Sequence, residues 1–317
     1  MTSFRSMAFL IVSSLLVSTA AADVFVVDSV SDAADADERD GLCDVGSGAC
    51  TLRAALEEAN RRPGPDTVLF ALDPGGGFII RPGSELPTID DPVTIDGTSQ
   101  PGHAGTPLIE LDGSAATGFP HGFRITGGNT RLESLSIHSF RNSSIRLSSR
   151  GGNEVVGCLI GARPNGSTPG SGLNGIYVFE SPGNRIIDNL IANSTSHGVH
   201  VSGLGSGGTI VQGNVLGLAD DGVTPAGNGL RGISIVDAPD CVIGGPDDGE
   251  GNVVMASGTE GIAIVEAGSG GAVVTGNRVG GGGTLRNFVG LFVNGASDCR
   301  IGGDTLGAAN VVSGNFT

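Results

Sequence analysis

The stretch from Gly261-Ile262-Ala263-Ile264 to Ala272-Val273-Val274-Thr275-Gly276-Asn277 contains two short apolar strands separated by a turn. A strand of this length cannot bury its apolar face alone and needs neighbouring copies of itself. Seven segments share one apolar, any residue, apolar pattern, and their starts lie 22 to 34 residues apart. They are Phe123-Arg124-Ile125, Ile145-Arg146-Leu147, Ile176-Tyr177-Val178, Val199-His200-Val201, Ile233-Ser234-Ile235, Ile262-Ala263-Ile264 and Leu291-Phe292-Val293. A recurrence at this period predicts a stacked solenoid.

The turns between these segments indicate which kind of solenoid forms. Leucine-rich, ankyrin and helical repeats place a helix in every unit, and no apolar-periodic stretch long enough for one follows Asn60. Gly-Asn pairs recur instead, and both residues tolerate the left-handed backbone of a tight bend. Stacked Asn side chains can also bond their copies one coil away. We therefore expect an all-β fold over residues 66–317, a single-stranded parallel β-helix with two or three strands in each coil.

The composition agrees with a narrow aliphatic core and an acidic surface. The chain has 56 Gly, no Trp and one Tyr among 317 residues. Lysine is absent, and the 17 arginines face 33 acidic residues, which gives a formal net charge of −16. Such a charge disfavours general binding to nucleic acid or to anionic membranes.

The first 22 residues have the pattern of an export signal. Arg5 supplies a positive start, residues 7–17 an apolar stretch, and residues 18–22 a small-residue region with the expected cut after Ala22. The apolar stretch is too short to span a bilayer, and no later segment has 18 uninterrupted apolar residues. We expect a secreted or cell-surface protein without a transmembrane helix.

The cysteines fit an oxidising compartment. Cys43 and Cys50 enclose a small glycine-rich loop and are expected to form a disulfide, with two free thiols as the alternative. Cys241 and Cys299 occupy matching repeat positions two coils apart, about 9.6 Å, beyond the roughly 7 Å limit for a disulfide. Cys158 is expected to be a small buried filler.

One helix is predicted, over residues 51–60. Leu52, Ala55, Leu56 and Ala59 form its apolar stripe, Thr51 can cap its start, and Arg61-Arg62-Pro63-Gly64 ends it. A solenoid has an open apolar end that must be covered. We therefore expect residues 23–65 to form an N-terminal helical cap.

This region carries a resemblance to a known family. Cys50-Thr51-Leu52-Arg53-Ala54-Ala55-Leu56 resembles the Cys-Ser-Leu-Arg-Glu-Ala motif of CSLREA-domain proteins, with Thr and Ala as departures at positions 51 and 54. Residues 242–254 and 301–315 are similar to the repeats of those bacterial proteins. The resemblance implies a right-handed parallel β-helix of the pectin-lyase-like superfamily. It implies no common activity that can be assigned to residues.

The enzymes of that wider superfamily provide one motif to compare. Residues 196–206, which include His197, resemble the Gly-His-Gly segment of polygalacturonases, and Arg231 lies 34 residues beyond that histidine. Inverting hydrolysis, however, needs two carboxyl groups about 6.5–9.5 Å apart. One coil earlier the chain has Asn174, whose amide can neither donate a proton nor activate water. Asp188 is too near in sequence, and Asp220-Asp221 falls in a turn-rich loop after the histidine. Hydrolysis is therefore not favoured.

Strand alternation predicts an outward column on the repeated segments. With the flanking apolar residues inside, one side chain of each coil points outward, about 4.8 Å from the next. The column is Arg124, Arg146, Tyr177, His200, Ser234, Ala263 and Phe292. Its first four members are the candidate substrate-binding residues, because guanidinium groups pair with carboxylated or sulfated sugars and Tyr can stack on a sugar ring. An acidic or neutral polysaccharide is the expected partner, and an ordinary exposed strip is the alternative.

Acidic runs raise the question of a metal ion. Seven acidic residues lie after Asp23 in the run that ends at Asp44, and later loops carry others. Calcium needs six to eight oxygen ligands, and none of these runs has a spacing that predicts such a site. We expect a solvated acidic loop and no cofactor. A lyase that uses an arginine base and a metal-bound uronate would need clustered carboxylates beside the column, and the sequence shows none there.

Two functions remain open from the sequence. A non-catalytic surface or glycan-binding protein leads, and a polysaccharide lyase, epimerase or hydrolase is the alternative. A convergent set of carboxylates beside a base on one face would favour the enzyme. Residues 310–315 read as the start of another coil, and no covering segment follows. We therefore expect a solenoid that continues beyond this chain, or one that associates through this end.

Overall fold

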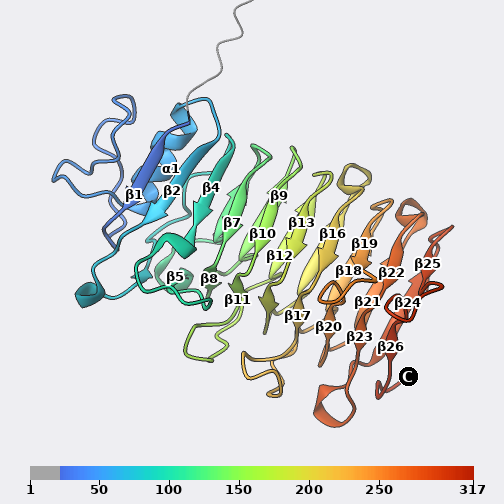
Figure 1. Cartoon of the computed structure of the whole chain (residues 1–317). Helices are drawn as coiled ribbons and strands as arrows, with labels where there is room; N and C mark the ends of the chain where they lie inside the picture. Colours follow the sequence, from blue (N-terminus) through green and yellow to red (C-terminus); the bar gives the residue numbers. More distant parts are fainter. Residues whose placement is uncertain (1–21) are drawn as a thin grey trace, which may run out of the picture.

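Three parallel sheets wrap around one apolar core in the computed structural model, which describes residues 22–317 (Figure 1). The chain passes from sheet to sheet, so that neighbouring strands in each sheet come from successive coils. The predicted leader lies outside the described residues except for Ala22. The predicted parallel β-helix is thus confirmed, with three strands in a complete coil.

Each sheet is a ladder of parallel strands. The ten-stranded sheet contains β1 (Val24–Val27), β2 (Asp66–Phe70), β4 (Val93–Asp96), β7 (Arg131–Glu133), β10 (Glu154–Val156), β13 (Arg185–Ile187), β16 (Ile210–Gln212), β19 (Val242–Gly244), β22 (Val273–Thr275) and β25 (Arg300–Ile301). The nine-stranded sheet contains β3 (Ile79–Ile80), β5 (Ile109–Asp112), β8 (Leu135–His138), β11 (Leu159–Ile160), β14 (Leu190–Ile191), β17 (Val215–Leu216), β20 (Val253–Val254), β23 (Arg278–Val279) and β26 (Val311–Val312). The seven-stranded sheet contains β6 (Phe123–Ile125), β9 (Ile145–Ser148), β12 (Ile176–Phe179), β15 (Val199–Ser202), β18 (Ile233–Val236), β21 (Glu260–Val265) and β24 (Val289–Asn294).

The seven segments that predicted the fold are the strands of the seven-stranded sheet. Their flanking apolar side chains point inward, as Ile176 and Val178 show by their complete burial on either side of the half-buried Tyr177. Short 3₁₀ turns interrupt the connections between strands. They are η1 (Pro74–Gly76), η2 (Gly97–Ser99), η3 (Gly113–Ala115), η4 (Leu204–Ser206), η5 (Ala267–Ser269) and η6 (Gly283–Leu285).

Buried asparagines stack along the corners of the coils. In the longest ladder, the amide nitrogen of each Asn side chain donates to the side-chain oxygen of the next Asn at 2.9–3.0 Å. Its members are Asn189, Asn214, Asn252, Asn277 and Asn310. The Gly-Asn pairs do not share one corner, because separate contacts join Asn153 to Asn184 and Asn287 to Asn315. The ladders satisfy amides that the tight bends leave without strand partners.

Glycine is required immediately before one ladder position. Gly276 has a φ of 68°, and a Cβ there would lie 2.0 Å from the carbonyl oxygen of Gly245. The neighbouring coil therefore leaves no room for a side chain in front of Asn277.

Helix α1 (Leu52–Arg61) lies at the N-terminal end of the helix of coils, beside β1 and β2 (Figure 1). Thr51 caps it as predicted, because its hydroxyl accepts a hydrogen bond from the Ala54 amide at 3.0 Å. The predicted disulfide between Cys43 and Cys50 is present just before the helix. Cys158 and Cys241 are buried free thiols.

The last coil leaves apolar side chains exposed. Ile301 on β25 and both residues of β26, Val311 and Val312, have exposed fractions of 46–56%. Whether copies of the chain meet at this coil stays a prediction. Within residues 22–317, no helix has the length and apolar character needed to cross a membrane.

Candidate functional site

The four predicted binding residues lie side by side on the outward face of the seven-stranded sheet. In the strand register, Arg124 on β6 faces Arg146 on β9, which faces Tyr177 on β12, which faces His200 on β15. The predicted column is therefore in place. That these residues bind a ligand stays a prediction.

The column changes character after His200. Ser234 on β18 and Ala263 on β21 continue the register but are fully buried, so the expected exposed strip does not run the length of the sheet. Arg231 covers Ser234, because its guanidinium donates to the serine hydroxyl at 3.2 Å. Exposure returns at Phe292 on β24. The chemically distinctive part of the face is thus confined to four coils.

Side chains from three of these coils form a stack. The Arg146 guanidinium lies 5.5 Å from the centre of the Tyr177 ring, and the Tyr177 ring stacks on His200 with 5.2 Å between centroids. His197 continues the stack at 4.8 Å from His200. Because neighbours cover both faces of the tyrosine ring, its edge and hydroxyl are what a ligand would meet. The expected stacking of Tyr177 on a sugar ring is not favoured by this arrangement.

A second row of polar side chains runs beside the column, three residues before each column position, where the chain enters the strand. The Arg231 amide donates to His197 Nδ1 at 3.3 Å, so the neutral imidazole carries its proton on Nε2. The Arg231 guanidinium in turn forms an ion pair with Glu260 at 3.0 Å. On the other side, the His197 amide donates to the side-chain oxygen of Asn174 at 3.3 Å. The row is therefore continuous over four coils.

Both histidines of the site are neutral at neutral pH. Burial, together with the neighbouring His200 and Arg231, lowers the pKa of His197 to about 4. Burial and the charge of Arg231 likewise lower the pKa of His200 to about 4. His200 Nδ1 is buried and has no hydrogen-bond partner among the described residues. His200 thus keeps a buried imidazole nitrogen that no described residue satisfies.

Glu260 is the carboxylate of this cluster. Burial raises its pKa, but hydrogen bonds from Thr259 and Arg231 outweigh burial and leave the pKa below its usual value. Its ion pair with Arg231 makes it a poor proton donor. Asp188 and Asp220 line a different pocket, between the ten-stranded and nine-stranded sheets, together with Asn189 and Val215. In residues 22–317, the pair of free carboxyl groups that hydrolysis needs is not found beside His197.

The two arginines at the start of the column are unpaired. Within the described residues, eight other arginines form ion pairs, but Arg124 and Arg146 do not. Arg146 Nε is buried without a hydrogen-bond partner. His121, also buried, has a pKa that burial lowers and that the charges of Arg146 and Arg124 lower further. This end of the face is therefore locally positive on an acidic protein.

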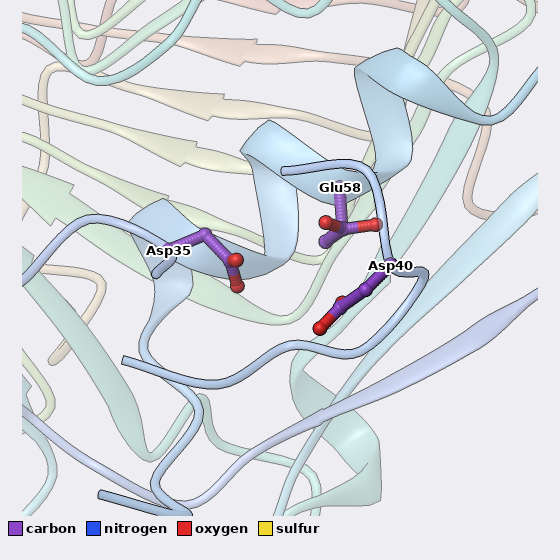
Figure 2. A group of neighbouring side chains, drawn as sticks. All are labelled: Asp35, Asp40 and Glu58. Carbon is purple, nitrogen blue, oxygen red and sulfur yellow. The ribbon is translucent and has the colours of Figure 1, made fainter. Parts of the chain in front are cut away.

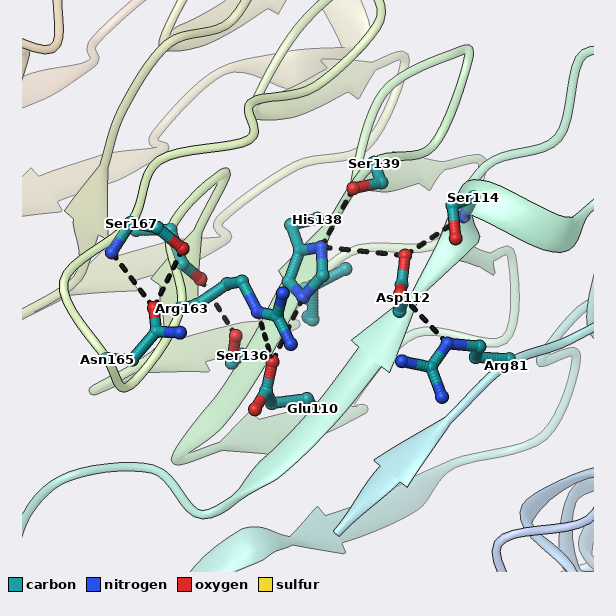
Figure 3. A network of polar contacts seen from close by, with 12 residues as sticks. Arg81, Glu110, Asp112, Ser114, Ser136, His138, Ser139, Arg163, Asn165 and Ser167 are labelled. Carbon is teal, nitrogen blue, oxygen red and sulfur yellow. Dashed lines mark hydrogen bonds and ion pairs between the residues drawn. The ribbon is translucent and has the colours of Figure 1, made fainter. Parts of the chain in front are cut away.

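A second polar cluster lies on the nine-stranded sheet (Figure 3). His138 on β8 is buried between two carboxylates of β5, at 3.3 Å from Glu110 and 3.8 Å from Asp112. Arg163 pairs with Glu110 at 2.7 Å, and Arg81 pairs with Asp112 at 3.1 Å. Each carboxylate is thus paired with an arginine. The ion pairs form a self-contained network that holds the loops of residues 81 and 163 to the sheet.

Comparison with known proteins agrees with this architecture. A family model described as the right handed beta helix region matches residues 121–306, more than half of the chain. The chain belongs to the right-handed β-helix family. Its coils are therefore right-handed, as expected, whereas the CSLREA resemblance of the cap stays a prediction. No curated protein matches this chain.

Two solved structures resemble this β-helix protein. One is the A-module of mannuronan C-5 epimerase AlgE4 from Azotobacter vinelandii, with 13% identity, a TM-score of 0.45, and coverage of 87% of this chain and 97% of that one. The other is a pectate lyase, Pel9A, with 12% identity, a TM-score of 0.36, and coverage of 92% and 82%. Neither resemblance assigns an activity or a residue role to this chain.

The cluster of His197, Arg231 and Glu260 was not predicted from the sequence. His197 and Arg231 were visible only as part of an incomplete hydrolase motif, and Glu260 stood in no motif. A signal existed, because all three lie three residues before the column position of their own coil. Aligning the strands by that register would have placed them in one row.

Proposed function

We propose that this β-helix protein binds an acidic polysaccharide along the outward face of β6, β9, β12 and β15. The observation that carries the proposal is that Arg124 lies opposite Arg146 in register, while neither forms an ion pair with a carboxylate within residues 22–317. Like charges directly opposite each other on neighbouring strands are destabilising. A ligand carboxylate or sulfate would offset that repulsion and form charge-assisted hydrogen bonds.

The rest of the face supports a linear ligand. A polymer lying along the column would meet one side chain per coil, about every 4.8 Å. The arginines would bind its anionic groups, and the Tyr177 hydroxyl and the His200 imidazole would bind its hydroxyl groups. The protein surface is otherwise acidic, so the arginines would also fix where an anionic chain can lie.

The test is direct binding of polyuronates and sulfated glycans, measured by calorimetry, with a neutral glycan for comparison. We expect the double change Arg124→Gln and Arg146→Gln to reduce affinity for an acidic glycan about tenfold or more. The matched control is Arg278→Gln with Arg300→Gln, which removes the same charge from exposed positions on β23 and β25. Equal affinities of the two double variants would contradict the proposal, and so would tighter binding of the neutral glycan.

A second function is favoured by one specific observation. His197 and His200 are neutral imidazoles beside Tyr177 and the Arg231 guanidinium. Lyases and epimerases of uronates remove a proton next to a carboxylate, which needs a neutral base and a cation near that carboxylate. The site holds both, but the low pKa of the histidines makes them weak bases and Arg231 is already paired with Glu260. Binding without turnover is therefore the leading function.

Product assays on the same glycans distinguish between these two functions. A lyase would release unsaturated products, detected by their ultraviolet absorbance, and a hydrolase would release reducing ends. Product formation that His200→Gln abolishes without loss of glycan binding would establish the enzyme. Binding with no product and no change in uronate composition would establish the binding protein.

A further inference from the structure

Three carboxylates converge at the N-terminal end of the molecule, far along the chain from the candidate binding face. Asp35 and Asp40 lie in the loop between β1 and α1, and Glu58 lies on α1 (Figure 2). One oxygen of each lies within 4.8 Å of the other two. From the sequence, the two aspartates were expected in a solvated loop and Glu58 in a helix whose role was to cover the coils.

Glu58 is the decisive member of this cluster. Its exposed fraction is 0%, and neither of its carboxylate oxygens has a hydrogen-bond partner among the described residues. Figure 2 shows its carboxylate directed into the space between the helix and the loop that carries Asp40. An ionised carboxylate buried without a partner is strongly unfavourable. Glu58 is therefore a buried acceptor that the described residues leave without a hydrogen-bond partner.

The neighbouring arginines are engaged elsewhere. Arg62 pairs with Asp23 at 2.6 Å, and Arg61 pairs with Glu38 at 2.8 Å. Among residues 22–317, no arginine or histidine forms an ion pair with Asp35, Asp40 or Glu58. Burial and the charges of the two aspartates together raise the pKa of Glu58 to about 7, and the charge of Arg62 and the Gly41 amide offset the rise only in part. Three acidic groups thus face one another without a paired counter-charge.

The two aspartates are held in place by the loop itself. Asp35 accepts hydrogen bonds from the amides of Asp37 at 2.8 Å and Asp44 at 3.0 Å. Asp40 accepts one from the Leu42 amide at 2.8 Å. Each bonded oxygen keeps a second lone pair. The carboxylates are therefore oriented by the backbone while their remaining lone pairs stay free.

We propose that Asp35, Asp40 and Glu58 bind a calcium ion that joins the N-terminal loop to helix α1. The donors are all carboxylate oxygens, which suit hard divalent cations rather than zinc or copper. Three carboxylates can supply up to six oxygens, and calcium accepts six to eight in flexible geometry, whereas magnesium demands a near-ideal octahedron. A site shared by a loop and a helix fits the more flexible requirement of calcium.

The ion would act on the cap of the solenoid. It would fix the loop of residues 35–44 against α1, next to the disulfide that closes the adjoining loop of residues 43–50. Binding to the folded state alone would stabilise the protein in proportion to the logarithm of the calcium concentration. The site is thus expected to affect stability at the N-terminal end and not glycan binding on β6 to β15.

The test is calcium titration of the EDTA-treated full protein by calorimetry at about pH 8, where carboxylates are ionised. We expect Glu58→Gln, which keeps the shape of the side chain but removes its charge, to lose one equivalent of bound calcium. Asp40→Asn should weaken the same site about tenfold or more. The matched control is Asp247→Asn with Asp248→Asn, two exposed acidic positions in another loop, which should bind as the unchanged protein does.

Thermal unfolding gives a second readout that a misfolded variant could not imitate. In EDTA, Glu58→Gln should unfold at the same temperature as the unchanged protein or higher, because it removes a buried unpaired charge. In calcium, the unchanged protein should gain several degrees and the variant should not. Unaltered calcium binding in Glu58→Gln, no binding at up to about 10 mM calcium, or preferential binding of magnesium would overturn the proposal. The first two results would leave Glu58 as a purely structural side chain, and the third would assign the site to magnesium.

Discussion

Arg124 on β6 lies directly opposite Arg146 on β9, and neither guanidinium forms an ion pair within the described residues. In a chain with 33 acidic residues, two opposed and unpaired arginines are an unusual arrangement. It places a local positive charge at one end of a row of polar side chains. That placement has consequences for stability as well as for binding.

Removing one of the two charges should stabilise the free protein. We expect Arg124→Gln to raise the free energy of unfolding by about 0.2–1 kcal/mol, because it ends the repulsion between opposed like charges. Urea denaturation at low salt measures this effect. Arg278→Gln is the control, since Arg278 stands between Val253 and Val311 in the register and should show no gain. An equal gain in the control would contradict the argument from Arg124 and Arg146.

Stability should fall as the pH falls from about 6.5 to about 4. Burial holds the pKa of His197 and His200 near 4 in the folded protein, so the unfolded chain takes up protons in this window that the folded chain does not. The stabilisation is therefore fully present above the window, and on the order of 3 kcal/mol for each imidazole is lost across it.

The histidine effect can be isolated by denaturation at several pH values. The double change His197→Gln and His200→Gln should flatten the slope, and His103→Gln, which leaves both imidazoles in place, is the control for replacing a histidine elsewhere. His121 and His138, whose pKa values burial also lowers, contribute equally in both variants. An unchanged slope in the double variant would mean that the two imidazoles do not titrate as the structure indicates.

The cysteines should differ sharply in reactivity. Mass spectrometry without reduction should show one bridged peptide with Cys43 and Cys50. Alkylation of the folded protein should label Cys299, which is partly exposed, and spare Cys158 and Cys241, because burial raises the pKa of both thiols to about 12. Reduction should cost about 2–3 kcal/mol of stability, as expected for a short loop. Two free thiols at positions 43 and 50 would refute the bridge.

The asparagine ladder should be essential to the stacking of coils. The Asn252 side chain accepts hydrogen bonds from Asn214 and donates to Asn277 and to the Val211 carbonyl. We expect Asn252→Ala to cost on the order of 3 kcal/mol, because it leaves several buried polar groups unpaired. Asn294→Ala, at an exposed position on β24, should cost less than about 0.5 kcal/mol. Similar losses in the two variants would contradict a structural role for the ladder.

Much of the fold was predictable because the repeat is local. A strand that alternates apolar and outward residues fixes which side chains face the core, and a repeat fixes which strands are neighbours. Arg124, Arg146, Tyr177 and His200 could therefore be placed in one column without a structure. The burial of Ser234 could not be predicted in this way, because it depends on where the long side chain of Arg231 lies.

The sequence by itself determined the parallel β-helix, the helix capped by Thr51, the disulfide and the column on the seven-stranded sheet, since each follows from spacing along the chain. Only the tertiary structure decided that Tyr177 lies between Arg146 and His200, that Arg231 pairs with Glu260, and that Glu58 faces Asp35 and Asp40. The physical reason is that these groups meet across coils or across a loop. Contacts of that kind depend on side-chain direction and loop path, which no local pattern encodes.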